Sequence, residues 1–203
     1  MDIGYTHPPA LAWELHNRAL DEAMEQCERT ADYPEGSRVK WTCEVTGVAL
    51  HWLKTASAAQ VERMRRLVAN GQMSFGAMLL HWTAAHQEDL LRESLHGIKV
   101  LRDTLGANIR FAMQTDVNGV PWSVADMLLD AGIEGLMMNI NIHMGGFALT
   151  RPSVFRWGTP AGRELTVFSG EHYNAFTREA GLRRGAPNAG VAVEQAGLDA
   201  MQE

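Results

Sequence analysis

Residues suited to acid, base or metal chemistry stand at one end of each predicted strand in this chain of 203 residues. In the clearest case an apolar run beginning at Arg110 breaks at Asp116, and Asn118-Gly119 and Pro121 then mark a turn. A buried parallel strand has this pattern when it carries a carboxylate to the rim of an α/β fold. A lone Asp after a strand is most often a turn former or a helix cap. Here Asn118-Gly119 already supplies the turn chemistry, so Asp116 is our first candidate for a catalytic residue.

The same pattern recurs along the chain. The polar residues at predicted strand ends are Asp2, Glu44, His81, Asp116, His143, Glu171 and His172. Taken singly, each has an ordinary explanation, because such carboxylates are often solvated and such histidines are often bonded to backbone in a core. However, the carboxyl ends of parallel strands meet at one edge, so one crevice is expected to collect all seven. Aromatic residues near these ends either pack in the rim or offer a face on which a sugar ring stacks; they are Trp82, Trp122 and Tyr173.

Strands and helices alternate in the sequence. β-Branched, aromatic and apolar runs predict strands at 38–45, 72–80, 135–142, 154–157 and 164–168, and one before Asp116. Apolar periodicity and capping residues predict a helix after Pro8-Pro9 and further helices at 48–54, 57–69, 87–105 and 124–131. This alternation predicts an α/β fold of parallel strands with right-handed helical crossovers. We expect residues 1–182 to form this domain, and 183–203 to be a loop and the start of a following helix.

Composition narrows the classes of function. With 46% hydrophobic and 21% charged residues, the chain is expected to be one compact domain or part of a larger one. Its net charge of -6 provides no basic field for a polyanion, which argues against a nucleic-acid partner. No window approaches the roughly 18 apolar residues of a membrane span, and the amino terminus has no signal segment, so we expect a cytoplasmic protein. Cys27 and Cys43 are expected to be buried free thiols rather than a disulfide.

Two chemistries suit carboxylates and histidines at the mouth of an α/β fold. One is a zinc site with Asp and His ligands and an open coordination position. The other is glycoside hydrolysis, in which one carboxylate attacks the anomeric carbon and another group protonates the leaving oxygen. Residue types and spacing leave both open.

An ordered set of short motifs resembles glycoside hydrolase family 38, the α-mannosidases. Asp2-Ile3-Gly4-Tyr5 resembles the second half of the family's amino-terminal His-x-Asp-x-Gly-aromatic motif. Later pieces follow in the family's order over most of residues 1 to about 175. They are the Trp-x-x-Glu strand ending at Glu44, the helix end from Leu67 to Gln72, Asp116 with Gly119, and a strand ending in His143.

The resemblance implies a seven-stranded β/α barrel that holds one zinc ion and hydrolyses α-mannoside-like substrates with retention. Matched residue by residue, Asp2 is a zinc ligand, and Asp116 is both a zinc ligand and the nucleophile. Tyr5 faces the sugar by the same match. We expect the other strand-end residues to bind substrate; these are Glu44, His81, His143 and His172.

The chain also departs from the family pattern. The zinc-binding His expected two residues before Asp2 is absent, and the usual Asp-x-x-Gly-His reads Asp116-Val-Asn-Gly-Val. Met78-Leu-Leu-His81-Trp82 stands where the family commonly has an acidic residue after Gly-Gly-Trp. We therefore expect a divergent barrel fragment, cut at both ends, that lacks some zinc ligands and the acid/base group. Alternatives are a metal-dependent hydrolase resembling polysaccharide deacetylases, and a carbohydrate-binding barrel without turnover.

Overall fold

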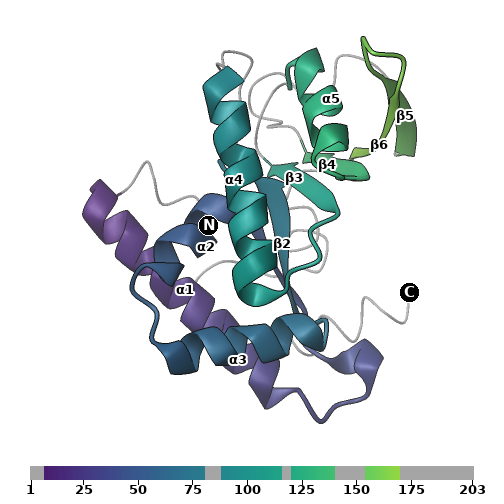
Figure 1. Cartoon of the computed structure of the whole chain (residues 1–203). Coiled ribbons are helices and arrows are strands. Elements are labelled where there is room, and N and C mark those ends of the chain that lie inside the picture. Colours follow the sequence, from purple (N-terminus) through teal and green to yellow (C-terminus); the bar gives the residue numbers. More distant parts are fainter. Residues whose placement is uncertain (1–6, 81–87, 116–119, 140–153, 170–203) are drawn as a thin grey trace.

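The computed structural model describes residues 7–80, 88–115, 120–139 and 154–169 (Figure 1). The helices are α1 (Pro9–Arg29), α2 (Thr46–Leu53), α3 (Ala58–Ala69), α4 (Glu88–Leu105) and α5 (Trp122–Asp130), with a 3-10 turn η1 (Glu35–Ser37). The strands are β1 (Trp41–Val45), β2 (Met73–Met78), β3 (Phe111–Thr115), β4 (Gly135–Asn139), β5 (Val154–Gly158) and β6 (Glu164–Ser169). No helix in these parts of the chain is both long and apolar enough to span a membrane.

Local signals in the sequence place the helix ends. Proline starts α1 at Pro9, where the missing N–H has no partner to lose. The predicted capping box of α3 is confirmed, since the Ser57 hydroxyl accepts from the Gln60 amide while the Gln60 side chain accepts from the Ser57 amide. Gly71 ends that helix with a φ of 77°, a conformation that favours glycine.

β1 is shorter at its start than predicted. The residues before it, Arg38 and Val39, bond to the end of α1 instead of to a strand. The Arg38 guanidinium donates to the Tyr33 carbonyl at 2.9 Å, and the Val39 amide donates to the Thr30 hydroxyl at 2.9 Å. Arg38 and Val39 therefore belong to the connection between α1 and β1 and not to the strand.

Parallel pairing dominates the sheets. β1 pairs with β2, and β3 with β4 and β4 with β6, all in parallel. β2 also lies beside β3, because a Cβ built on Gly76 would stand 3.5 Å from the Met113 amide nitrogen (Figure 1). The described strands thus form two sheets, one with the order β1-β2 and one with the order β3-β4-β6-β5, which meet where β2 lies beside β3.

The last two strands correct the prediction of purely parallel strands with helical crossovers. β5 and β6 pair antiparallel, with Gly158 opposite Glu164. The turn between them contains Gly162 at a φ of 75°. A parallel connection needs a dozen or more residues, so the short turn at residues 159–163 allows only a hairpin.

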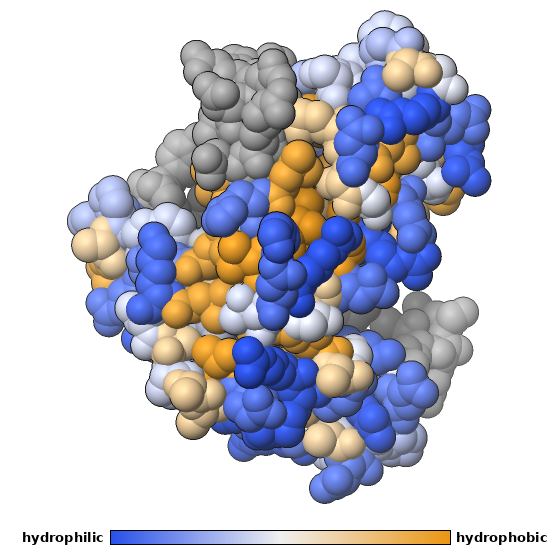
Figure 2. Space-filling view, in the orientation of Figure 1, coloured by the Kyte–Doolittle hydropathy of each residue, from blue (hydrophilic) through white to orange (hydrophobic). Residues whose placement is uncertain are grey.

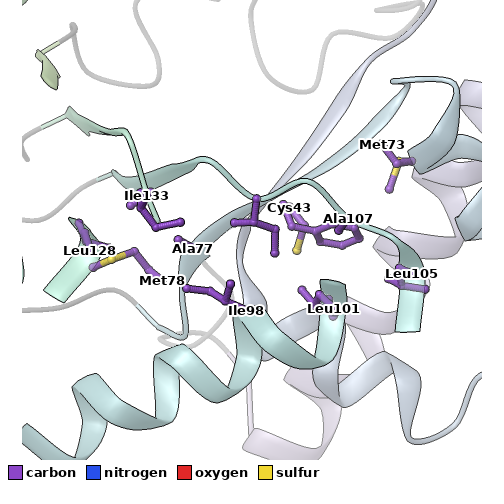
Figure 3. Close-up of a cluster of buried hydrophobic side chains, with 14 of the residues drawn as sticks. Cys43, Met73, Ala77, Met78, Ile98, Leu101, Leu105, Ala107, Leu128 and Ile133 are labelled. Atoms are coloured by element: carbon purple, nitrogen blue, oxygen red, sulfur yellow. The ribbon is translucent and has the colours of Figure 1, made fainter. Parts of the chain in front are cut away.

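The helices cover one face of the sheet. Ala112, Leu136 and Val167 lie in register on β3, β4 and β6, and all three are buried in one hydrophobic core. Figure 3 shows Ile98, Leu101 and Leu105 of α4 pointing toward the residues on the strands and on the loops after α4 and α5. Cys27 and Cys43 are buried free thiols in the same core, as predicted.

Candidate functional site

Polar residues gather at the carboxyl edge of β3, β4 and β6. In register, Thr115 lies beside Asn139, and Gln114 lies beside Met138, which in turn pairs with Ser169. Gln114, Asn139 and Ser169 are buried although the earlier part of each strand is mostly apolar. Burying a polar side chain costs free energy unless it is hydrogen-bonded. The three buried polar residues therefore make the carboxyl edge of these strands the candidate site.

Alternation along the strands divides this row between the two faces. Gln114 and Ser169 share the helix-covered face with Ala112 and Val167, whereas Thr115 and Asn139 share the opposite face. The Ser169 hydroxyl is buried and has no hydrogen-bond partner among the residues that the structure describes. Sequence reasoning missed Gln114, Asn139 and Ser169, because only the register shows that they align.

Two aromatic side chains on the face away from the helices are exposed, although Asn139 on the same face is buried. Phe111 at the start of β3 is 53% exposed, and its ring lies over Gly135, where a Cβ would stand 2.9 Å from two ring carbons. Phe168 on β6 is 43% exposed and pairs with Met137. This face therefore presents exposed aromatic side chains next to the polar carboxyl edge.

Glu44 is the one predicted site residue within the described ranges. It lies near the carboxyl end of β1, is half-buried, and has its Oε1 atom buried. Cys43 precedes it and faces the core, where burial raises the pKa of the thiol to about 12. That thiol is protonated at neutral pH and faces the core, so Cys43 is unsuited to act as a nucleophile.

The other predicted site residues lie outside the described residues. They are Asp2, Tyr5, His81, Asp116, His143 and His172, together with Glu171. The chain order still relates several of them to described strand ends. β3 ends at Thr115, directly before Asp116, and β6 ends at Ser169, two residues before Glu171.

A metal site is not formed by the described residues alone. Among them, no three His, Cys, Asp or Glu side chains are grouped as a metal ion would require. Both predicted ligands, Asp2 and Asp116, lie in undescribed ranges. The described polar residues at these strand ends therefore do not make up a ligand set, since Gln114 and Asn139 carry amides and lie on opposite faces of the sheet.

Polar contacts tie α5, the helix that follows Asp116, to the β5–β6 hairpin. The Trp122 indole N–H donates to the Gly158 carbonyl at 2.7 Å. Arg163 donates to the Asp126 carboxylate at 2.8 Å and to the Asp130 carboxylate at 2.6 Å. A hydrogen bond from Thr159 and the bonds from Arg163 hold the pKa of Asp126 below its usual value. Because these carboxylates are engaged with the hairpin, they serve structure rather than catalysis.

The fold and its polar carboxyl edge define an α/β protein of the kind that binds ligands at the ends of parallel strands. A family comparison gives the assignment. The model of the glycosyl hydrolases family 38 N-terminal domain matches residues 1–198, so the chain belongs to this family, as its motifs suggested. No curated protein matches the chain significantly.

Solved structures share the fold at low sequence identity. An α-mannosidase from Enterococcus faecalis V583 is 14% identical, with a TM-score of 0.64 over 95% of this chain and 21% of its own. A glycosyl hydrolase family 38 protein from Enterococcus faecalis is 15% identical, with a TM-score of 0.59 over 90% of this chain and 21% of its own. A 4-alpha-glucanotransferase from Thermococcus litoralis is 19% identical, with a TM-score of 0.53 over 84% and 27%. The chain thus spans about a fifth of the length of the first two structures.

Proposed function

We propose that this chain forms the amino-terminal part of the catalytic domain of a zinc-dependent, retaining glycoside hydrolase that acts on α-mannoside-like substrates. Membership of glycosyl hydrolases family 38 supports the reaction class. We also propose that the described strands belong to a seven-stranded β/α barrel, since five of the six described strands pair in parallel and helices cover one face.

The observation that carries the proposal is the position of β3. It lies beside β2 and pairs with β4, and it ends in Gln114 and Thr115 immediately before Asp116. A parallel strand that becomes polar at its carboxyl end is where α/β folds place catalytic carboxylates. This supports Asp116 as the nucleophile.

In the proposed reaction, an Asp116 carboxylate oxygen attacks the anomeric carbon and forms a glycosyl ester as the glycosidic bond breaks. The leaving oxygen takes a proton from an acid that we do not assign within this chain. Water then attacks the same carbon and releases the carboxylate, so the configuration is retained after two inversions.

Zinc would be held by Asp2 and Asp116 with further ligands, and when bound it supplies a positive charge that binds sugar hydroxyls and favours ring distortion. Tyr5 offers an aromatic face to the sugar. The remaining polar strand-end residues are proposed to bind sugar hydroxyls; they are Glu44, His81, His143 and His172. Carbohydrate is therefore the proposed partner.

Hydrolysis of 4-nitrophenyl α-mannoside in the presence of zinc tests the proposal. In a protein that joins this chain to the rest of the catalytic domain, we expect Asp116→Asn to abolish release of 4-nitrophenol while Asp103→Asn, a change in an exposed ion pair on α4, leaves it intact. Metal-dependent acetate release from an acetylated sugar without glycoside cleavage would instead support the deacetylase-like alternative. Sugar binding with neither reaction would support a binding barrel.

A further inference from the structure

A bulge in the β1–β2 pair lies opposite Glu44. Cys43 pairs with Phe75 and Val45 pairs with Met78, so one residue on β1 faces two residues, Gly76 and Ala77, on β2. Bulges bend a strand and redirect side chains, and they are common next to active sites. The bulge thus affects the local backbone at Glu44, the one predicted substrate-binding residue that the structure describes.

Gly76 allows the backbone of Glu44 to approach β2 closely. A Cβ on residue 76 would stand 2.3 Å from the Glu44 carbonyl oxygen and 3.5 Å from the Met113 amide nitrogen. The first distance is far inside any real contact, and the obstructing atom is backbone. Residue 76 therefore has to be glycine for β1, β2 and β3 to keep their spacing at Glu44.

The residues after Glu44 are fastened to the end of β2. The Thr46 hydroxyl, which is fully buried, donates to the Met78 carbonyl at 3.3 Å. The Gly47 amide donates to the Leu79 carbonyl at 3.0 Å. Glu44 is thus held between its contact with Gly76 and these bonds at the start of α2.

Gly97 of α4 fixes Thr46 from the other side. A Cβ on residue 97 would stand 2.6 Å from the Thr46 Oγ1 atom, 3.2 Å from the Thr46 Cβ and 3.4 Å from a methyl carbon of Leu50. The absence of a side chain lets α4 pack directly on α2. In Figure 2, hydrophobic residues gather in the middle of the view, in the region of these two helices.

We infer that Gly76, Thr46 and Gly97 are positioning residues for Glu44. Together these three residues fix the backbone on both sides of Glu44 and so set the direction in which the Glu44 side chain points from β1. The inference deepens the proposed function, because it assigns these residues to the orientation of a sugar-binding carboxylate. Gly97 lies on α4, far along the chain from Glu44, and acts through Thr46.

The test uses Gly97→Ala in the full chain. Its matched control is Gly36→Ala, because a Cβ at Gly36 meets nothing within 4 Å. Alanine is the better helix former, so intrinsic propensity acts against any loss seen at Gly97. Thr46→Ala in the Gly97→Ala background removes the Oγ1 atom that obstructs the new methyl group and is the rescue variant. Thr46→Val keeps the size of residue 46 but removes the hydroxyl donor.

The readout is the 13C chemical shift of the Glu44 side-chain carboxyl, assigned with Glu44→Gln. We expect it to move in Gly97→Ala, to move less in Thr46→Val, to return in the double variant only to about the Thr46→Val value, because that variant also lacks the Thr46 hydroxyl, and to stay unchanged in Gly36→Ala. An unchanged Glu44 signal in a folded Gly97→Ala variant overturns the inference. If Gly97→Ala does not fold, an unchanged Glu44 signal in Thr46→Val overturns the inference instead.

Binding of methyl α-mannoside separates this inference from the proposed function. Where wild type binds, we expect Gly97→Ala to weaken binding about three- to tenfold, the loss of about one hydrogen bond, and the double variant to recover binding only to the level of Thr46→Val. If wild type binds no mannoside, the proposed function fails, whereas the carboxyl signal still decides whether the junction positions Glu44.

Discussion

The β1–β2 pair and the β5–β6 hairpin are held in the protein by different forces. Cys43, Met73 and Phe75 of the first pair are buried in a core shared with α1, α3 and α4. The hairpin instead leaves Val154 58% exposed and attaches to α5 through Trp122 and the ion pairs of Arg163. In the hairpin, β6 buries Leu165 and Val167 in the same core, whereas β5 lies at the edge and is attached through β6 and these polar contacts. This difference predicts that β1 and β5 respond unequally to mutation.

The largest effect is expected in the packed region, from Leu101→Ala on α4. Leu101 is fully buried, so the change removes apolar contacts and leaves a cavity, and we expect a loss of about 3 kcal/mol in the free energy of unfolding. Urea denaturation measures it. Leu11→Ala, at a position that is 39% exposed, is the control and should cost less than about 0.5 kcal/mol. Equal losses would contradict the comparison.

Gln72→Met is expected to have the next largest effect. The buried Gln72 side chain donates to the Cys27 carbonyl at 2.7 Å and to the Val39 carbonyl at 3.1 Å. Methionine fills similar space but leaves both carbonyls without this donor, so we expect a loss of about 2 kcal/mol. The midpoint of thermal unfolding reports it. Gln26→Met on the exposed side of α1 should leave the midpoint unchanged.

Trp122→Phe tests the polar attachment of the hairpin. The change keeps an aromatic ring but removes the indole donor to the Gly158 carbonyl. Because that bond is exposed to solvent, we expect a global loss of only about 0.5–1 kcal/mol. Amide hydrogen exchange should nevertheless increase in β5 while β1 stays protected. Faster exchange in both regions would show that the two are not independent.

Lowering the pH should slightly weaken the attachment of the β5–β6 hairpin and should not change the packing of the β1–β2 pair. The pKa of Asp126 in the folded protein is lowered from 3.8, chiefly by its hydrogen bond from Thr159 and then by Arg163. Its contribution to stability is therefore present above the unfolded-state pKa and is lost as the pH falls through the folded-state pKa. We expect wild type to be slightly more stable than Asp126→Asn at pH 7 and at pH 5. The difference should shrink as the pH falls below the unfolded-state pKa of aspartate, about 3.9. A difference that does not change as the pH is lowered would exclude the carboxylate as its cause.

Local sequence signals predicted most of the elements. The apolar stripe of α4, the capping box at Ser57 and the proline at the start of α1 depend on neighbours in the chain, and each lies where it was expected. The antiparallel pairing of β5 and β6 departs from the parallel strands that were predicted for the fold as a whole. Its turn at Pro160-Ala161-Gly162 was visible in the sequence, but the alternation of strands and helices was applied to the whole chain.

The candidate site was less predictable because it depends on register. Glu44 was found as a polar strand end, but the bulge opposite it arises from the pairing of β1 with β2. Gln114, Asn139 and Ser169 resemble ordinary strand residues until β3, β4 and β6 are aligned. The roles of Asp2, Asp116 and the strand-end histidines stay predictions, since these residues lie outside the described ranges.

The proposed role of Asp116 is tested most directly by trapping the glycosyl ester. A protein that joins this chain to the rest of the catalytic domain is incubated with zinc and a fluorinated mannosyl donor, which slows breakdown of the intermediate, and is then digested for mass spectrometry. We predict one added fluorosugar on the peptide that contains Asp116, and none in Asp116→Asn. Metal-dependent acetate release without labelling, or labelling at another carboxylate such as Glu44, would contradict the assignment.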